Sequence, residues 1–198
     1  DAARTVVRDA SMQGFRAADA PVSGGTAAAS GGTLTFMVGC REQDFAEMEE
    51  ALKPMAKAII RAGDAGAGQA AKICNNMLLG ISMIATCEAF VLAERLGLDA
   101  QKFFDIASKA SGQCWSLTSY CPWPGPVPAA PSNRDYEGGF AAAMMLKDLR
   151  LAQEAAMSVG ADTPLGGGAQ ALYAELVDKG HAGKDFSFML QMLRGAIQ

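Results

Sequence analysis

A long apolar helix is the sequence feature that most constrains the fold. Residues 67–96 are compatible with one uninterrupted helix, and the run from Met77 to Leu92 within them contains a single charge, Glu88. At ~1.5 Å rise per residue such a helix extends about 45 Å. A membrane span needs roughly 20 consecutive apolar residues, and Glu88 interrupts this run. We therefore expect a buried central helix of a helical domain, and no membrane partner.

Three polar residues sit just inside this helix. Lys72, Asn75 and Asn76 are spaced i, i+3 and i+4, so they share one helix face. Burial and the positive end of the helix dipole both lower a lysine pKa, which would suit Lys72 for proton transfer near neutral pH. The alternative is a lysine whose stem packs while its ammonium reaches solvent. We expect the two asparagines to find buried hydrogen bonds, one to a ligand and one to neighbouring backbone.

Composition excludes several classes of function. The chain has 198 residues and a net charge of −4, with no basic stripe to neutralise phosphates, so we expect no nucleic-acid partner. Its five cysteines form no C-x-x-C pair and there is one histidine, so we expect no metal site. Reduced cysteines indicate the cytoplasm, or the mitochondrial matrix if the source is eukaryotic.

The two parts of the chain differ in pattern. Residues 1–65 mix helix and strand signals, as at the end of a Rossmann-type α/β sheet. The expected elements there are a helix at 1–10, a strand at 14–19, a glycine turn at 23–25, a strand at 33–39, a helix at 42–51 and a strand at 58–62. Residues 66–198 are all-α. After the long helix, with Gly97 as its stop, we expect an Asp99-capped helix at 100–110, a proline-rich loop at 120–134, and helices at 139–159, 165–179 and 185–195, the last capped by Asp185.

A glycine pattern at the start of the long helix invites a cofactor interpretation. Gly66-x-Gly68-x-x-Ala71 matches a dinucleotide-binding fingerprint and follows a possible strand. A true fingerprint opens a βαβ unit with an acidic residue near the end of the next strand. No strand follows here, so we reject this interpretation. We expect the glycines to form a domain hinge and to let the helix start pack closely.

Other candidates carry weaker signals. Ser23-Gly24-Gly25 is a tight turn whose backbone N–H groups and hydroxyl would suit a carboxylate. Lys147 and Asp148 are a charged interruption of an apolar helix, which makes them candidate site residues. The alternative is that they form an ordinary solvated face of that helix. Trp115 and Trp123 are more typical of packing than of ligand contacts. His181 follows Gly180 between helices, where a surface role is expected.

Taken together, these segments resemble the β-hydroxyacid dehydrogenase family, and most closely its hydroxyisobutyrate branch. The resembling segments occur in the family's order and cover nearly the whole chain: Asp19-Ala-Pro-Val-Ser-Gly-Gly-Thr26, Gly31-Gly-Thr-Leu-Thr-Phe-Met-Val-Gly39, Gly68-Gln-Ala-Ala-Lys-Ile-Cys-Asn-Asn-Met77, Cys114-Trp-Ser116, Tyr136-Glu-Gly-Gly-Phe140 and Leu146-Lys-Asp-Leu149.

The resemblance implies a fold, an activity and site residues. Residues 1–65 would be the C-terminal remnant of a dinucleotide-binding domain, and residues 66–198 a substrate and dimerisation domain. The family oxidises small β-hydroxy acids with a nicotinamide cofactor, NAD, with NADP not excluded. The implied roles are Lys72 as the catalytic lysine, Ser23, Gly24, Gly25 and Asn76 as substrate ligands, and Lys147 and Phe140 as cofactor contacts. A homodimer or homotetramer is implied.

One departure from the family pattern limits what this chain is expected to do alone. Family members begin with a strand and a Gly-x-Gly-x-x-Gly turn that hold the pyrophosphate, and this chain begins beyond them. We therefore expect a truncated chain with little activity by itself. Two alternatives stay open: a sibling reductase acting on tartronate semialdehyde, glyoxylate or succinate semialdehyde, and a non-catalytic helical assembly module.

Overall fold

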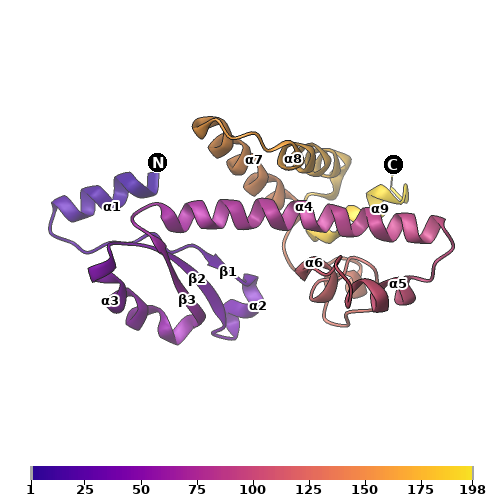
Figure 1. The fold of residues 1–198 in the computed structure, drawn as a ribbon, viewed down its shortest axis with the longest axis horizontal. Helices are drawn as coiled ribbons and strands as arrows, with labels where there is room; N and C mark the ends of the chain where they lie inside the picture. The colour runs from indigo at the N-terminus through magenta and orange to yellow at the C-terminus, as the bar shows by residue number, and fades with distance from the viewer. Residues whose placement is uncertain (1, 198) are drawn as a thin grey trace. The chain divides into compact units, whose positions relative to one another are not determined.

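The computed structural model describes residues 2–197. The chain forms two compact units, one up to Asn75 and one from Asn76 onward, and the division falls inside helix α4 (Ala67–Arg95). The two units are described separately below, and Figure 1 shows the elements of each. The expected mainly α fold, with a small α/β part followed by helices, is confirmed.

The first unit contains a three-stranded sheet. Its strands are β1 (Val22–Ser23), β2 (Leu34–Gly39) and β3 (Ala56–Gly63), in the order β1-β2-β3. Strand β1 is antiparallel to β2, and β2 is parallel to β3. The parallel pair is joined through helix α3 (Glu42–Leu52) and a short 3-10 turn (Lys53–Met55), which is the crossover that parallel strands require.

The central strand supplies the core of this unit. Leu34, Phe36 and Val38 alternate along β2 and are buried, as expected for one face of a pleated strand. Residues of α3, among them Phe45 and Met48, pack against this face. Each fully buried side chain of this kind contributes roughly 1.5–3 kcal/mol.

Two expectations for the first unit need correction. The predicted strand at 14–19 does not form: only Asp19 makes an isolated bridge, to Gly39, and Phe15 is 64% exposed. Pairing with β2 instead occurs after Pro21, where Val22 is opposite Phe36 and Ser23 is opposite Thr35. Helix α1 (Ala2–Met12) confirms the helix expected at 1–10. A short helix α2 (Gly25–Ser30), which begins at the last glycine of the turn, was not predicted.

The second unit is all-α. Besides its part of α4 it contains α5 (Ala100–Ala107), α6 (Trp115–Thr118), α7 (Ala142–Val159), α8 (Pro164–Leu176) and α9 (Met189–Leu193), with short 3-10 or π turns at Pro131–Arg134, Val177–His181 and Phe186–Phe188. The expected stop at Gly97 is confirmed: φ is +76°, and the Leu98 N–H bonds the Ala93 carbonyl. Asp99 caps α5 through the Lys102 N–H at 3.0 Å, as expected.

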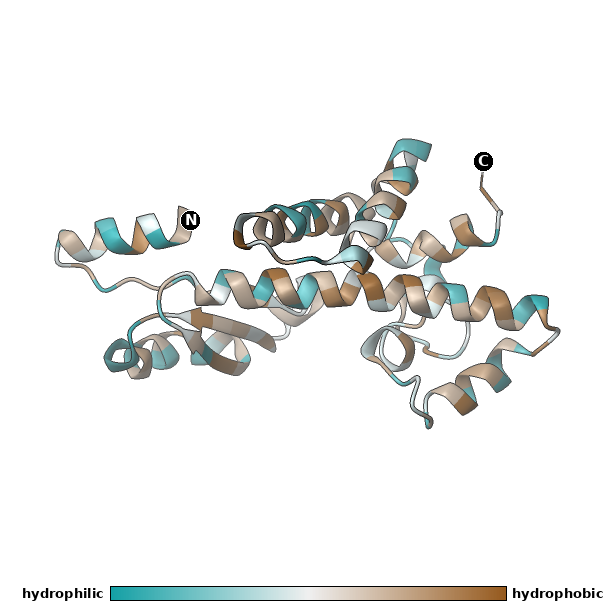
Figure 2. Ribbon diagram, turned by 45° about the horizontal axis from the view of Figure 1, so that its top comes forward, coloured by the Kyte–Doolittle hydropathy of each residue, from teal (hydrophilic) through white to brown (hydrophobic). Residues whose placement is uncertain are grey.

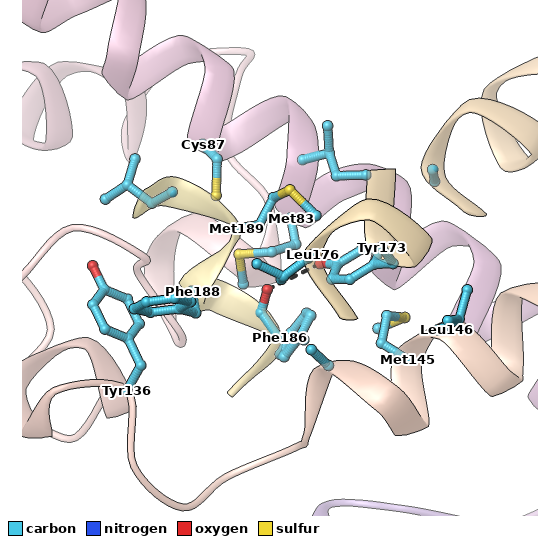
Figure 3. Close-up of a cluster of buried hydrophobic side chains, with 14 of the residues drawn as sticks. Met83, Cys87, Tyr136, Met145, Leu146, Tyr173, Leu176, Phe186, Phe188 and Met189 are labelled. Carbon is cyan, nitrogen blue, oxygen red and sulfur yellow. Dashed lines mark hydrogen bonds between the residues drawn. The ribbon is translucent and has the colours of Figure 1, made fainter. Parts of the chain in front are cut away.

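The helices of the second unit enclose one large apolar cluster. Figure 3 shows Met83 and Cys87 of α4 facing Tyr173 and Leu176 of α8, with Met189 among them. All five side chains are fully buried. The Tyr173 hydroxyl donates to the carbonyl of Phe186 at 3.1 Å, which satisfies the one polar atom that this ring brings into the core.

Helix α4 is less completely buried than its composition suggested. Apolar positions extend along most of its length (Figure 2), and 44% of its most apolar 18-residue window is buried. Leu78 and Leu92 are 63% and 60% exposed. By length and composition alone, α4 could cross a membrane. Core helices of soluble proteins have the same length and composition, so these two properties do not indicate a membrane span.

Candidate functional site

The glycine turn that follows β1 has a backbone that only glycine adopts easily. Gly24 has φ of +130° and Gly25 has φ of +66°, and a Cβ at Gly24 would lie 2.4 Å from the Ala28 Cβ. Ser23, which precedes them, is partly buried and pairs with Thr35 of β2. The turn therefore requires glycine at Gly24 and places the Ser23 hydroxyl beside backbone N–H groups, the donor types that suit an anionic group.

The N-terminus of α4 is occupied by a carboxylate of the same unit. Asp19 Oδ1 accepts from the Gly66 N–H at 2.6 Å, and Oδ2 accepts from the Gln69 N–H at 2.8 Å. These are two of the backbone donors that a helix leaves unpaired at its start. Asp19 is buried, at 7% exposure. The first turn of α4 therefore holds a protein carboxylate where a dinucleotide fingerprint would hold a phosphate.

The glycines at this helix start serve close packing, as expected. A Cβ on Gly68 would lie 2.3 Å from the carbonyl oxygen of Met37 and 2.8 Å from Asp19 Oδ2. Gly39 of β2 is equally tight, since its Cβ would lie 2.2 Å from Asp19 Oδ1. Helix, strand and carboxylate thus meet with no room for a side chain.

Lys72 lies in the second turn of α4, three residues after Gln69. Its side chain is partly buried and interacts with neighbouring groups. Asn75 is exposed, so the expectation that both asparagines would be buried is wrong for this one. Cys74, between Lys72 and Asn76, is also exposed. Burial therefore differs between the adjacent positions Asn75 and Asn76, although helix spacing places both on the face of Lys72.

Asn76 is the buried member of the group, at 2% exposure. Its Nδ2 donates to Asp148 Oδ2 at 2.5 Å, and Asp148 Oδ1 lies 2.8 Å from the Lys147 Nζ. The Lys147 side chain is 53% exposed, whereas that of Asp148 is 13% exposed. The second unit therefore brings together Asn76, Asp148 and Lys147 in one polar chain, with the lysine at its solvent end.

The backbone of Phe140 is anchored by the buried carboxylate of Asp185. Its N–H donates to Asp185 Oδ2 at 2.8 Å, and the Tyr120 hydroxyl donates to the same oxygen at 2.8 Å. Asp185 Oδ1 accepts from the Ser187 N–H and hydroxyl, which confirms the expected cap. Burial raises the pKa of Asp185, and the hydrogen bonds from Ser187, Phe140 and Tyr120 oppose that rise.

Aromatic residues extend this network. Trp115 is 50% exposed and stacks on Tyr120, with ring centroids 4.9 Å apart. Trp123 stacks on Phe90, and the ring of His181 lies 4.8 Å from that of Phe188. These three contacts are packing contacts. Within residues 2–197, His, Cys, Asp and Glu side chains form no group of three or more that could hold a metal ion.

Sequence reasoning missed three polar roles: Asp19 at the start of α4, Asp148 as the partner of Asn76, and the Tyr120–Asp185 pair. Each joins residues at least 47 positions apart. The one available signal was the place of Asp19 at the head of the Asp-Ala-Pro-Val-Ser-Gly-Gly segment.

Two family models match the chain. Residues 66–193 match the model described as the NAD-binding region of NADP-dependent 3-hydroxyisobutyrate dehydrogenase. Residues 1–63 match the NAD-binding domain of 6-phosphogluconate dehydrogenase. The two matches meet between residues 63 and 66, directly before α4.

Individual proteins resemble the chain over nearly its whole length. A probable 3-hydroxyisobutyrate dehydrogenase of Mycobacterium tuberculosis is 50% identical over 97% of this chain and 65% of its own length. The mitochondrial 3-hydroxyisobutyrate dehydrogenase of Drosophila melanogaster is 45% identical over 98% of this chain and 60% of its own length. An NAD-dependent L-serine dehydrogenase of Pseudomonas aeruginosa is 46% identical, with 96% and 64% covered. The chain thus spans less than two thirds of the length of these relatives.

A solved structure confirms the similarity in three dimensions. Mycobacterium tuberculosis 3-hydroxyisobutyrate dehydrogenase, determined with L-serine, superposes with a TM-score of 0.93 at 49% identity. The match covers 97% of this chain and 66% of that one.

Proposed function

Because this chain belongs to the 3-hydroxyisobutyrate dehydrogenase family, we propose that the complete protein oxidises a small β-hydroxy acid with a nicotinamide cofactor. The first candidate substrate is 3-hydroxyisobutyrate, whose oxidation gives methylmalonate semialdehyde. The observation that carries the proposal is the arrangement along α4, where partly buried Lys72 precedes buried Asn76 by one helical turn.

Lys72 is proposed as the general base. In its neutral form its amine accepts the proton of the substrate β-hydroxyl while a hydride leaves the carbon that bears it. In the reverse direction the ammonium returns that proton to the developing alkoxide. Asn76 is proposed to orient the reacting hydroxyl, because its buried amide is held in one orientation by the hydrogen bond to Asp148.

Ser23, Gly24 and Gly25 are proposed to bind the substrate carboxylate. The backbone N–H groups of the positive-φ glycines and the Ser23 hydroxyl are donors of the kind that a carboxylate accepts from. The names of the relatives support this substrate class: 3-hydroxyisobutyrate and L-serine both carry a hydroxymethyl group one carbon from a carboxylate. They differ only in whether that carbon bears a methyl or an ammonium group.

A nicotinamide cofactor fits the donor set of the second unit. Lys147 offers a half-exposed positive charge and Phe140 a partly buried ring with its backbone anchored to Asp185. These two residues are proposed to hold the nicotinamide end, and the cofactor when bound supplies the hydride acceptor. NAD is the first candidate, with NADP as the alternative. The start of α4 does not fit the pyrophosphate, because Asp19 fills it.

Two further proposals concern organisation. Residues 1–65 are proposed to belong to the dinucleotide-binding domain and residues 66–198 to form the substrate and dimerisation domain. Self-association as a homodimer or homotetramer is supported by the exposed Leu78 and Leu92, which lie four turns apart on one side of α4. Leu92→Asp should weaken the oligomer in light scattering, whereas Met12→Asp, at an exposed site in the first unit, should not.

The compartment is also proposed. All five cysteines are free thiols, which fits a reducing environment. We propose the cytoplasm for a bacterial source and the mitochondrial matrix for a eukaryotic one. The name of the Drosophila relative, which describes it as mitochondrial, supports the second.

The test is a substitution of the base in the complete protein. Lys72→Ala should lower turnover of 3-hydroxyisobutyrate about 10³-fold, because general base catalysis typically contributes about 10²- to 10⁴-fold. The circular dichroism spectrum should stay unchanged. Lys57→Ala, at an exposed lysine of β3, is the control and should retain full turnover. Retained turnover in the Lys72 variant would remove it from the base role. A panel with L-serine, tartronate semialdehyde, glyoxylate and succinate semialdehyde would identify the preferred substrate.

A further inference from the structure

Asp19 replaces a helix cap that α4 cannot supply from its own sequence. The first helical hydrogen bond runs from the Ala70 N–H to the Gly66 carbonyl, so Gly66 is the N-cap residue. Gly66 has no side chain with which to bond the third residue of the helix, as a usual N-cap does. Asp19 bonds both the N-cap N–H, at Gly66, and the third residue's N–H, at Gln69. One distant carboxylate thus satisfies the two donors that a local capping box would pair.

The backbone of Asp19 is anchored as firmly as its side chain. Its N–H bonds the Gly39 carbonyl at 3.1 Å, and its carbonyl accepts from the Gly39 N–H at 2.7 Å. Four residues later Ser23 pairs with Thr35 of the same strand. The segment 19–23 is therefore fixed along β2, with the α4 cap at one end and the Ser23 turn at the other.

The same residue thus connects the two parts of the proposed substrate site within the first unit. Lys72 follows Gln69 by three residues, or ~4.5 Å along the helix axis. Because Gly68 and Gly39 carry no side chain, their backbones pack directly against Asp19. A shift of the first turn of α4 would break these close contacts. We infer that Asp19 is a positioning residue, which fixes the start of α4 so that Lys72 is held in register with the Ser23-Gly24-Gly25 turn. This inference rests on the proposed function.

Asp19 also has an electrostatic consequence for the base. Its negative charge offsets the positive end of the α4 dipole close to Lys72. Removing that charge should disfavour the Lys72 ammonium and lower the lysine pKa. In the oxidation direction the neutral amine is the active form, so the rise of kcat with pH should move to lower pH.

The test compares Asp19→Asn with wild type in the complete protein. Asparagine keeps one acceptor, loses the other and removes the charge. We expect kcat to fall about 10- to 100-fold, the size expected for a small misplacement of a catalytic group, with KM changed less than about threefold. The midpoint of the kcat–pH profile should move down by about half a pH unit, as expected for one charge at a helix end.

Two further variants control the experiment. Asp19→Glu keeps the charge but misplaces the helix start, so it should restore the wild-type pH midpoint with kcat only partly recovered. If Asp19→Asn does not fold, Asp19→Glu alone decides, and wild-type kcat in that variant would overturn the inference. Asp44→Asn removes another buried carboxylate of the first unit, one that bonds Arg41 and not α4. It should leave kcat and the midpoint unchanged.

The outcomes separate the two proposals. An active wild type, an inactive Lys72→Ala and a folded Asp19→Asn with wild-type kcat and midpoint would overturn the positioning role alone. The same loss and midpoint shift in Asp44→Asn would also overturn it, since general destabilisation would then explain both. A wild type that oxidises no β-hydroxy acid, or an active Lys72→Ala, would overturn the proposed function and this inference with it.

Discussion

Asn76 and Asp148, which are 72 residues apart in the chain, meet side chain to side chain at 2.5 Å. The bond joins α4 to α7 inside the second unit and leaves Asp148 between a neutral amide and the Lys147 ammonium. Only 13% of the Asp148 side chain is exposed, and each of its carboxyl oxygens has a polar partner, as buried polar groups require.

Replacing Asn76 by alanine should destabilise the protein. The substitution removes a buried amide and leaves Asp148 Oδ2 without this donor, for which we expect a loss of about 1–3 kcal/mol in the free energy of unfolding. Urea unfolding measures it. Glu88→Ala, at an exposed position of the same helix, is the control and should change stability by less than about 0.5 kcal/mol. Equal losses in both variants would contradict the role given to the bond.

Two helical glycines should respond to alanine with opposite signs. Gly68→Ala places a Cβ against the Met37 carbonyl, a backbone atom that cannot rotate away, so we expect a loss of about 1–3 kcal/mol. Gly168→Ala in α8 meets no atom within 4 Å and should gain about 0.5–1 kcal/mol from helix propensity. Thermal unfolding distinguishes them, and a stabilised Gly68→Ala would show that the helix start can move.

Two buried serines should also differ. The Ser116 hydroxyl is buried and has no hydrogen-bond partner among residues 2–197, so Ser116→Ala should be neutral or stabilising by up to about 1 kcal/mol. The Ser132 hydroxyl donates to the Cys121 carbonyl at 2.8 Å, and Ser132→Ala should cost about 1–3 kcal/mol. The readout is the midpoint of chemical unfolding. A large loss in Ser116→Ala would reveal a partner for that hydroxyl.

Asp185 should make stability depend on pH in an unusual direction. Burial raises its pKa above the ordinary 3.8, so the folded state binds the proton more tightly than the unfolded state does. The stability linked to this group is complete below pH 3.8 and is lost as pH rises through the raised value. The deficit of Asp185→Asn relative to wild type should therefore shrink between pH 4 and 7, by about 1.4 kcal/mol per unit of pKa shift.

Glu94 provides the opposite case for comparison. The hydrogen bond from Arg194 lowers the pKa of Glu94 below its ordinary 4.5. Its contribution is therefore present above pH 4.5 and is lost as pH falls through the lowered value. The deficit of Glu94→Gln should shrink toward acid, and urea unfolding at a series of pH values measures both trends. Parallel trends in the two variants would contradict the assignment for Asp185.

The sequence predicted those elements whose signals are local. Strand 33–39 combines β-branched residues with flanking glycines, and the caps at Asp99 and Asp185 act over two or three residues. Helix α2 was missed because Gly25 is a poor helix former and the run that follows is short. The strand expected at 14–19 fails because strand pairing depends on a partner elsewhere in the chain.

The candidate site was only partly predictable for the same reason. Helix spacing groups Lys72, Asn75 and Asn76, yet Asn75 is exposed whereas Asn76 is only 2% exposed and bonds Asp148 of α7, a contact that helix spacing does not encode. The two bonds from Asp19 to α4 cross 47 and 50 residues. No local pattern encodes contacts at such separations.

Cys74 gives this helix a chemical handle for following the proposed site. It is exposed two residues after Lys72, whereas Cys40, Cys87 and Cys121 are buried, and burial raises the pKa of Cys121 to about 11. The thiolate is the nucleophile that attacks a thiol-labelling reagent, so an environment-sensitive fluorophore should attach first at the exposed Cys74. Its emission would then report, in real time and without turnover, whenever a ligand changes the surroundings of the second turn of α4.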